Sequence, residues 1–208
     1  MVAVAADPRL AGVEAPESPL RRAILDATER LLQEETLDEL SVAEILEEAN
    51  VSRATFYFYF AGKDDAFIAL LTEVMGDFVP RFEAIMADVE RRRSPRLTGD
   101  IAEWLSVDPS RRAVMRSAVE EWPRRPELAH VYLALQTRMA EALARAIDED
   151  RKAGVALESI PSAELAAGWI WTMERAWYQA VGGADHLHDL PAITDALAAT
   201  LVSAIYGG

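Results

Sequence analysis

The sequence predicts an all-α protein, and three observations support this fold class. Strand signals are nearly absent, because no Asn-Gly or Asp-Gly turn occurs and runs of alternating β-branched residues are missing. Apolar residues recur at helical spacing, and most of the ten prolines stand near the start or end of such a segment. Glycines follow several of these segments, as they do at helix C-termini. We expect about nine helices.

The expected helices follow one another from residue 20 onward. They lie at about 20–34, 42–49, 52–59, 63–91, 99–106, 109–122, 126–153, 161–182 and 191–206. The first has Ile24, Ala27 and Leu31 on one face, as an amphipathic helix requires. Lys63-Asp64-Asp65 places acids in the first turn of the fourth helix, and Gly154 and Gly182 stand where later helices end.

Composition limits the function classes. The chain has 208 residues, 51% of them hydrophobic, so a substantial core can be buried. No apolar run is long enough to cross a bilayer, the N-terminus lacks a basic n-region, and there are no cysteines. We expect a cytoplasmic protein without membrane association. The net charge of −14 argues against a protein that binds nucleic acid through an overall positive charge.

The second and third helices resemble a helix-turn-helix. "SVAE", residues 41–44, is a capping box in which the Ser41 hydroxyl accepts from the Glu44 backbone N–H. A turn at Asn50-Val51 follows, and Ser52 can cap a third helix that ends near Tyr59. Two short helices joined by a tight turn have the spacing of this motif.

Five aromatic residues, "FYFYF" at 56–60, favour a strand by propensity and a helix by context. On a helix, Phe56 and Phe60 fall on one side and would fill a small three-helix core. Tyr57, Phe58 and Tyr59 would then face outward. An ordinary core helix is the alternative, and it would require two phenol groups to be buried.

Residues 21–71, "RRAILDATERLLQEETLDELSVAEILEEANVSRATFYFYFAGKDDAFIALL", resemble the N-terminal DNA-binding domain of TetR-family transcriptional regulators. The family pattern S/T-x-x-T-h-Y-x-x-F-x-x-K is carried by Ser52, Thr55, Phe56, Tyr57, Phe60 and Lys63. The "FYFYF" run and the C-terminal "SAIYGG" look most like the branch that contains the mycobacterial ethionamide-activation repressor. The resemblance implies a homodimeric repressor of a double-stranded, palindromic DNA operator, released when a hydrophobic small-molecule effector binds.

The resemblance also implies a set of DNA contacts on the second and third helices and just beyond them. The residues are Ser41, Ser52, Arg53, Ala54, Thr55, Tyr57, Phe58, Tyr59 and Lys63. Those that open the third helix would lie nearest the base edges, and Phe58 would meet a thymine methyl. The tyrosines and the lysine would hold phosphates, helped by the helix N-termini.

The expected organisation is a flexible N-terminal arm at 1–19, a DNA-binding domain at 20–66 and a ligand-binding and dimerisation domain at 67–208. The DNA-binding region is itself acidic, since residues 20–75 hold five basic and twelve acidic side chains. An alternative function therefore stays open: a helical protein that binds a small molecule or a partner, with a degenerate head that does not bind DNA.

The second domain has the composition of an adaptable apolar cavity. It holds all five tryptophans, and tryptophan and methionine recur at i, i+4, i+8 on the helix at 161–182. Simple core packing is the alternative for any one of them. The candidate ligand-binding residues are Phe78, Phe82, Met86, Trp104, Met115, Trp122, Met139, Trp169, Met173 and Trp177.

An i+4 stripe on the last helix is the candidate dimer interface: Ile193, Leu197, Leu201 and Ile205. The same stripe could close the core of the single chain, and both can hold. "DHLHD", at 185–189, invites a metal site, but without cysteine or a third nearby histidine we expect none. No Gly-x-Ser-x-Gly elbow or phosphate-binding loop occurs, so we expect neither an enzyme nor a cofactor.

Overall fold

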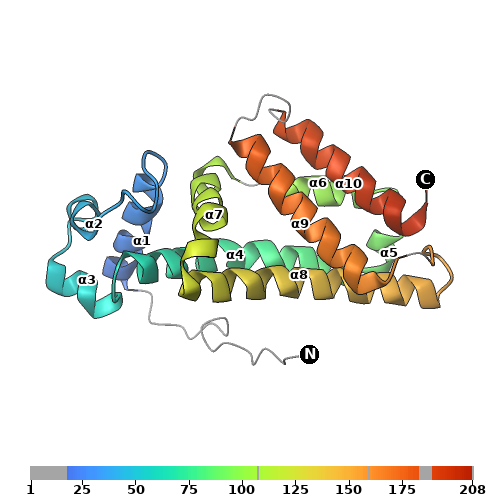
Figure 1. The fold of residues 1–208 in the computed structure, drawn as a ribbon, viewed down its shortest axis with the longest axis horizontal. Helices are drawn as coiled ribbons and strands as arrows, with labels where there is room; N and C mark the ends of the chain where they lie inside the picture. Colours follow the sequence, from blue (N-terminus) through green and yellow to red (C-terminus); the bar gives the residue numbers. More distant parts are fainter. Residues whose placement is uncertain (1–17, 107, 159, 183–188, 208) are drawn as a thin grey trace. The chain divides into compact units, whose positions relative to one another are not determined.

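Helices are the only regular elements in the part of the chain that the computed structural model describes, residues 18–106, 108–158, 160–182 and 189–207 (Figure 1). In order they are α1 Pro19–Leu31, α2 Val42–Ala49, α3 Arg53–Tyr59, α4 Lys63–Ala87, α5 Val89–Arg92, α6 Leu97–Leu105, α7 Pro109–Glu121, the short 3-10 helix η1 Trp122–Arg124, α8 Pro126–Lys152, α9 Ser162–Val181 and α10 Leu190–Tyr206. The predicted all-α class is confirmed. None of these helices has both the length and the apolar character that crossing a bilayer demands.

The helix expected at 63–91 is divided in two. Asp88 leaves the helical conformation at φ −81° and ψ 100°, and its side chain accepts from the backbone N–H of Arg91. The aspartate thereby caps a new short helix, α5, because a side-chain acceptor satisfies one of the free N–H groups at a helix start. The arm and the histidines of "DHLHD" lie outside the described residues.

The described chain folds as two compact units. The first takes in the chain up to Val74 together with Pro109–Val131, and the second takes in Met75–Asp108 and the chain from Tyr132 onward. Helices α4 and α8 therefore each contribute to both units. The predicted boundary after residue 66 lies in the first turns of α4, and α7 belongs with the head.

The first unit is built on a small apolar core made by α1, α2 and α3 (Figure 1). Ile24 and Leu25 of α1, Ile45 of α2 and Phe56 of α3 are all fully buried. Ile24 and Phe56 lie on the predicted apolar faces, whereas Leu25 was not predicted and the predicted Leu31 is only half-buried. This core fixes which side of α3 remains outside.

Helix α7 is tied to the rest of the first unit by an arginine. Arg125, just after η1, donates to the carboxylates of Asp38 and Asp64, with the Asp64 contact at 2.7 Å, and to Glu121 at 3.1 Å. Asp38 lies between α1 and α2, and Asp64 lies at the start of α4. One guanidinium therefore joins three parts of the unit, as its fork of donors allows.

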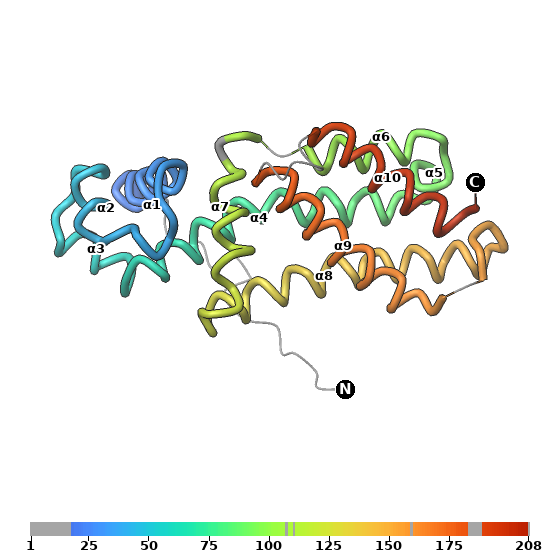
Figure 2. The backbone as a smooth tube through the Cα atoms, turned by 45° about the horizontal axis from the view of Figure 1, so that its top comes forward, coloured from blue at the N-terminus to red at the C-terminus, as the bar shows by residue number. Residues whose placement is uncertain are grey.

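In the second unit, α10 packs against α6 and α9, and Figure 2 shows α6 and α10 side by side. Leu197, Leu201 and Ile205 of the proposed dimer stripe are buried within the chain by this packing, and Ile193 is half-buried. The first three side chains therefore close the chain's own core and offer no surface to a second subunit. Residues at i+4 spacing share one helix face, and here α6 and α9 cover that face.

A buried ion cluster joins α5, α8 and α10 in the second unit. Arg92, 2% exposed, donates to the carboxylate of Asp150, 0% exposed, at 2.8 and 3.1 Å. Arg93 and the hydroxyl of Tyr206 also donate to Asp150, at 2.7 and 2.6 Å. Asp150 thus collects donors from two helices and the residue after α5, and this satisfies a charge that would otherwise be costly to bury.

The cluster makes stability depend on pH. Burial alone would raise the pKa of Asp150, but hydrogen bonds from Arg92, Tyr206 and Arg93 outweigh it and hold the pKa below its ordinary value of 3.8. A carboxylate whose pKa is lower in the folded state contributes stability above its unfolded pKa. That contribution is lost as pH falls through the folded value. The cluster therefore stabilises the fold at neutral pH and weakens in acid.

Replacing Asp150 by Asn should lower the free energy of unfolding at pH 7 by about 3–5 kcal/mol, because Arg92 keeps a buried charge without its partner. Urea titration followed by circular dichroism measures the loss. Asp100→Asn is the matched control, since Asp100 pairs with the exposed Arg91 and surface pairs contribute at most about 1 kcal/mol. Equal losses in the two variants, or a wild-type advantage that does not decline as pH falls below the ordinary pKa of 3.8, would contradict the assignment.

Candidate functional site

The candidate DNA-binding helix, α3, is set up by the turn before it. Asn50 adopts the left-handed conformation at φ 51° and ψ 48°, which ends α2. Asparagine tolerates this conformation better than most residues, since its short polar side chain can hydrogen-bond to the nearby backbone. Ser52 then begins α3, and its hydroxyl accepts from the backbone N–H of Thr55 at 3.0 Å. The helix-turn-helix expected from the capping residues is therefore present.

The aromatic run divides between the inside and the outside of the head. Phe56 and Phe60 are buried, at 0% and 4% exposure, whereas Phe58 is 80% exposed and Tyr57 is 49% exposed. A bare phenylalanine ring at a protein surface costs hydration free energy, and a large exposed apolar group commonly marks a contact site. The expected outward face of α3 is confirmed for Tyr57 and Phe58.

Arg53 is the exposed cation of this face. Among the described residues of the head, no carboxylate pairs with it. The arginines of α1 are engaged: Arg21 lies over the Phe60 ring, Arg22 pairs with Asp26 and Glu73, and Arg30 pairs with Glu48 at 2.6 Å. Arg53, Ala54 and Phe58 are exposed together, and Thr55 is half-buried beside them.

Lys63 has partners inside the head. Its ammonium donates to the backbone carbonyls of Asp38 at 2.9 Å and Leu40 at 2.7 Å. These contacts hold the segment before α2 against the start of α4, and two of the three N–H donors are engaged in them. The predicted phosphate contact of Lys63 therefore competes with a structural role.

Tyr59 is likewise directed into the head. Its hydroxyl donates to the Ser18 side chain at 2.7 Å, and the pair is half-buried. Ser18 stands immediately before α1, so this bond joins the end of α3 to the start of α1. The predicted phosphate contact of Tyr59 would require the hydroxyl to leave this partner.

The N-terminus of α2 already has an anion of its own. The Glu44 carboxylate accepts from the backbone N–H of Ser41 at 2.7 Å and from its hydroxyl at 2.5 Å. Hydrogen bonds from the Ser41 hydroxyl and then its backbone lower the pKa of Glu44. Glu44 therefore occupies the position where a phosphate at Ser41 is predicted, and the two anions would repel each other.

The ten predicted ligand-binding residues are divided by the fold. Met115 and Trp122 belong to the first unit, and the other eight belong to the second. In the second unit Phe78 stacks on Trp104 at 4.4 Å between ring centroids, and Phe82 lies 4.5 Å from the same indole. Trp169 lies parallel to Phe82 at 6.3 Å. Four of the ten residues thus form one aromatic cluster, and the predicted ligand cavity stays a prediction.

Trp177, also in the second unit, has a buried indole N–H group. Its side chain is buried, and its indole Nε1 has no hydrogen-bond partner among the described residues. Trp104 and Trp169, by contrast, donate to the carbonyls of Phe78 and Leu197 at 2.8 and 3.2 Å. A buried donor without an acceptor is uncommon in folded proteins.

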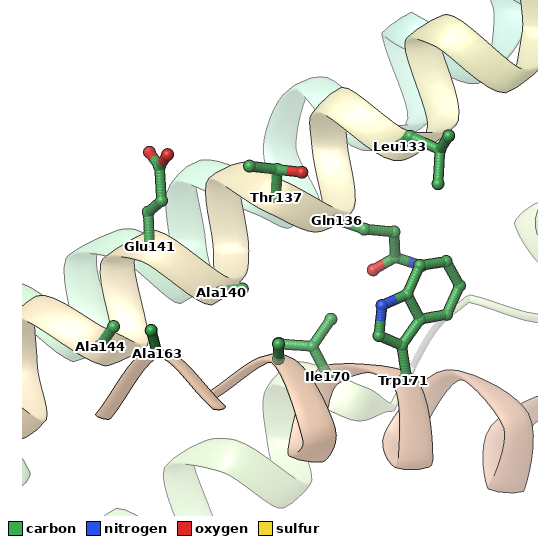
Figure 3. Close-up of a pocket in the computed structure, with 10 residues that line it drawn as sticks. Leu133, Gln136, Thr137, Ala140, Glu141, Ala144, Ala163, Ile170 and Trp171 are labelled. Atoms are coloured by element: carbon green, nitrogen blue, oxygen red, sulfur yellow. The ribbon is translucent and has the colours of Figure 1, made fainter. Parts of the chain in front are cut away.

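A groove between α8 and α9 was not anticipated from the sequence. It has a volume of about 210 Å³ and is bordered by Gln136, Ile170 and Trp171 (Figure 3). Its polar side chains Gln136, Thr137 and Glu141 lie on α8 and its other wall is formed by α9, so no local spacing points to it. The one sequence signal was Glu174, a charged residue in the middle of an apolar helix.

Comparison with known proteins places the chain in a family. A model of "Bacterial regulatory proteins, tetR family" matches residues 24–70, and a model of "Transcriptional regulator EthR, C-terminal domain" matches residues 97–207, more than half of the chain. HTH-type transcriptional regulator EthR of Mycobacterium tuberculosis is 29% identical over 188 residues, covering 89% of this chain and 86% of that protein.

Solved structures share the fold. SmeT, the repressor of the Stenotrophomonas maltophilia multidrug efflux pump SmeDEF, superposes with a TM-score of 0.72 at 20% identity, covering 91% of this chain and 93% of that one. The transcriptional regulator FadR from Bacillus subtilis, in complex with stearoyl-CoA, gives 0.65 at 22% identity, covering 89% and 99%. The helix-turn-helix, the two family models and the EthR relative agree, and the chain belongs to the TetR family of bacterial transcriptional regulators.

Proposed function

We propose that the protein is a cytoplasmic repressor that reads a palindromic DNA operator through α3. The observation that carries the proposal is the outer face of this helix, where Arg53, Tyr57 and Phe58 are exposed together. In the major groove a guanidinium pairs with guanine O6 and N7, and an apolar ring meets the thymine methyl. The name of SmeT as a repressor supports repression over activation.

The proposed operator is palindromic because we propose a homodimer. The outer faces of α9 and α10 carry small exposed residues, among them Gly168, Thr172, Ala196 and Ala199. Small side chains let helices approach closely, and a two-fold axis through such a contact would present two copies of α3. Two recognition helices related by a two-fold axis read two inverted half-sites.

We propose that the second unit binds a hydrophobic effector. The aromatic cluster around Trp104 supplies an apolar surface, and the buried Trp177 Nε1 supplies a donor without an acceptor. An effector with one acceptor atom on an apolar body would satisfy that donor. The stearoyl-CoA complex of FadR shows that a related fold accommodates a molecule with a long apolar chain.

A second function keeps support from the charge distribution. Lys63 and Tyr59 have partners inside the head, Glu44 holds the α2 N-terminus, and the chain carries a net charge of −14. These observations favour a helical ligand-binding or partner-binding protein whose head does not bind DNA. The experiments below separate it from the repressor.

DNase footprinting on the DNA beside the protein's own gene should reveal a protected palindrome, and Arg53→Ala should relax base preference within it. The reason is that Arg53 is the exposed cation of α3, and a bidentate contact to guanine discriminates by about 1–3 kcal/mol. Arg30→Ala is the matched control, because Arg30 lies on the same head but is paired with Glu48. No protection by the wild type at low salt would favour the head that does not bind DNA.

The affinity for this operator should depend weakly on salt. With few free cations on the head, we expect about four to six phosphate contacts per dimer, so log K against log salt should have a slope between about −3.6 and −5.4. Fluorescence anisotropy with a labelled operator over a range of KCl concentrations gives the slope. A slope near −10 would mean that many more cations reach the backbone than α3 and its surroundings supply.

Lys63→Ala should destabilise the first unit by about 1–2 kcal/mol and leave the salt slope unchanged. The variant loses two hydrogen bonds from a charged donor to the carbonyls of Asp38 and Leu40. Lys152→Ala, at the exposed end of α8, is the control for loss of a lysine. A slope that becomes shallower by about 2 per dimer, with stability unchanged, would instead support the phosphate contact.

A further inference from the structure

The groove between α8 and α9 has a mostly apolar wall. Four alanines, two from each helix, line it together with Ile170: Ala140, Ala144, Ala163 and Ala167. Leu133 and Trp171 border the groove, and both are exposed to solvent. The small alanine side chains explain why the groove is there, but they do not indicate which ligand binds in it. One polar residue, Gln136, gives that indication.

Gln136 brings an unsatisfied acceptor to the groove. The residue is only 7% exposed, and its Oε1 has no hydrogen-bond partner among the described residues. Figure 3 shows this oxygen directed toward the space that Ile170 and Trp171 border. A buried amide oxygen normally has a partner, since leaving it without one costs folding free energy. The acceptor is therefore available to a ligand.

The orientation of the Gln136 amide follows from its neighbours. The Tyr132 hydroxyl donates to Glu174 at 2.8 Å, and Gln136 Nε2 donates to the Tyr132 oxygen at 3.0 Å. Burial, followed by the Glu174 charge and the hydrogen bond to it, raises the pKa of Tyr132, so this hydroxyl keeps its proton. A flipped amide would set two acceptors against each other, because the tyrosine proton is already engaged. Oε1 must therefore face the groove.

The same chain of hydrogen bonds makes the groove electronegative. Glu174 is buried, and the cation that pairs with it, Arg175, is exposed and lies 3.8 Å from its other oxygen. Hydrogen bonds in series polarise one another. The Glu174 carboxylate polarises the Tyr132 O–H bond, and the Tyr132 oxygen in turn polarises the amide N–H of Gln136. Electron density shifts toward Gln136 Oε1, which becomes a stronger acceptor. The exposed Glu141 adds a carboxylate at the groove's edge, where it forms a loose surface pair with Arg145 at 3.8 Å.

We propose that this groove binds a small organic ammonium ion, whose N–H donates to Gln136 Oε1 while its apolar body lies against Trp171. An indole face attracts a cation, and an N–H donor satisfies the orphan acceptor. The volume of about 210 Å³ equals the liquid volume of about seven water molecules, so the ion is compact. Trp171 borders the groove with 38% of its surface exposed, so a ligand that reaches Oε1 must displace this indole.

The ammonium ion would bind at this site whether or not the protein binds DNA. Only an effect of this binding on transcription rests on the proposed function. The site also differs in ligand class from the proposed effector site, for which the aromatic cluster supplies apolar surface and Trp177 supplies a donor. A cation bound between α8 and α9 would act on two helices of the second unit at once.

Isothermal titration calorimetry of the full chain with 2-phenylethylammonium tests the proposal. N,N,N-trimethyl-2-phenylethylammonium keeps the charge but has no N–H, and 3-phenylpropionate replaces the cation by an anion. We expect the primary ammonium to bind about tenfold or more tightly than the trimethyl ion, and no measurable binding of the anion, because a hydrogen bond to a charged donor contributes this much. Equal affinity for the two cations would overturn the assigned contact.

Two variants locate the site, and a third is the control. Gln136→Leu removes the acceptor and should lower the affinity for 2-phenylethylammonium about tenfold or more. Tyr132→Phe should lower the affinity less, because it only removes the hydrogen bond that orients the Gln136 amide. Lys152→Ala changes an exposed residue at the end of α8, outside the groove, and should leave affinity unchanged. Circular dichroism confirms that each variant is folded, and unchanged affinity in folded Gln136→Leu contradicts the proposal.

The remaining outcomes separate this site from other roles of the groove. If no cation binds and Trp171→Ala alters the mass in sedimentation velocity, the groove is a contact between subunits and the proposal is wrong. A gel-shift with the operator is run in parallel. Failure of the wild type to bind DNA removes the proposed function but leaves a positive calorimetric result standing.

Discussion

The head depends on the burial of Phe56 and Phe60 in the core made with α1 and α2. A helix of seven residues has too few backbone hydrogen bonds to persist alone, so its apolar side must be held by packing. Once these two rings are fixed, the 3.6-residue repeat leaves Tyr57 and Phe58 no position except the outside. The surface that faces DNA in our proposal is thus a consequence of how the inside is filled.

Charge imposes the second constraint. The head holds twelve acids and five basic residues between 20 and 75, and most of its cations have partners within it. Such pairing keeps an acidic domain compact by limiting like-charge repulsion, but it withdraws cations from the surface. Recognition would then rely on shape, hydroxyls and Arg53 more than on attraction at a distance.

Features set by neighbouring residues could be predicted from the sequence, and features set by distant residues could not. The caps at Ser41 and Ser52 and the division of the aromatic run follow from local spacing. The partners of Lys63 are carbonyls more than twenty residues away, and the Gln136–Tyr132–Glu174 chain joins two helices, so neither leaves a local signal. The α10 stripe was ambiguous for a related reason, since an apolar face is the same whether its own chain or a second one covers it.

The first unit is assembled from two stretches of chain, because α7 packs on α1 and Arg125 reaches back to Asp38 and Asp64. During synthesis on the ribosome, the helix-turn-helix therefore emerges long before the residues that complete its unit. Its contacts with α7 and Arg125 form only after these residues have left the exit tunnel, and until then part of α1 lacks its covering. While the intervening helices are being translated, the uncovered surface of α1 is thus available for association with other chains.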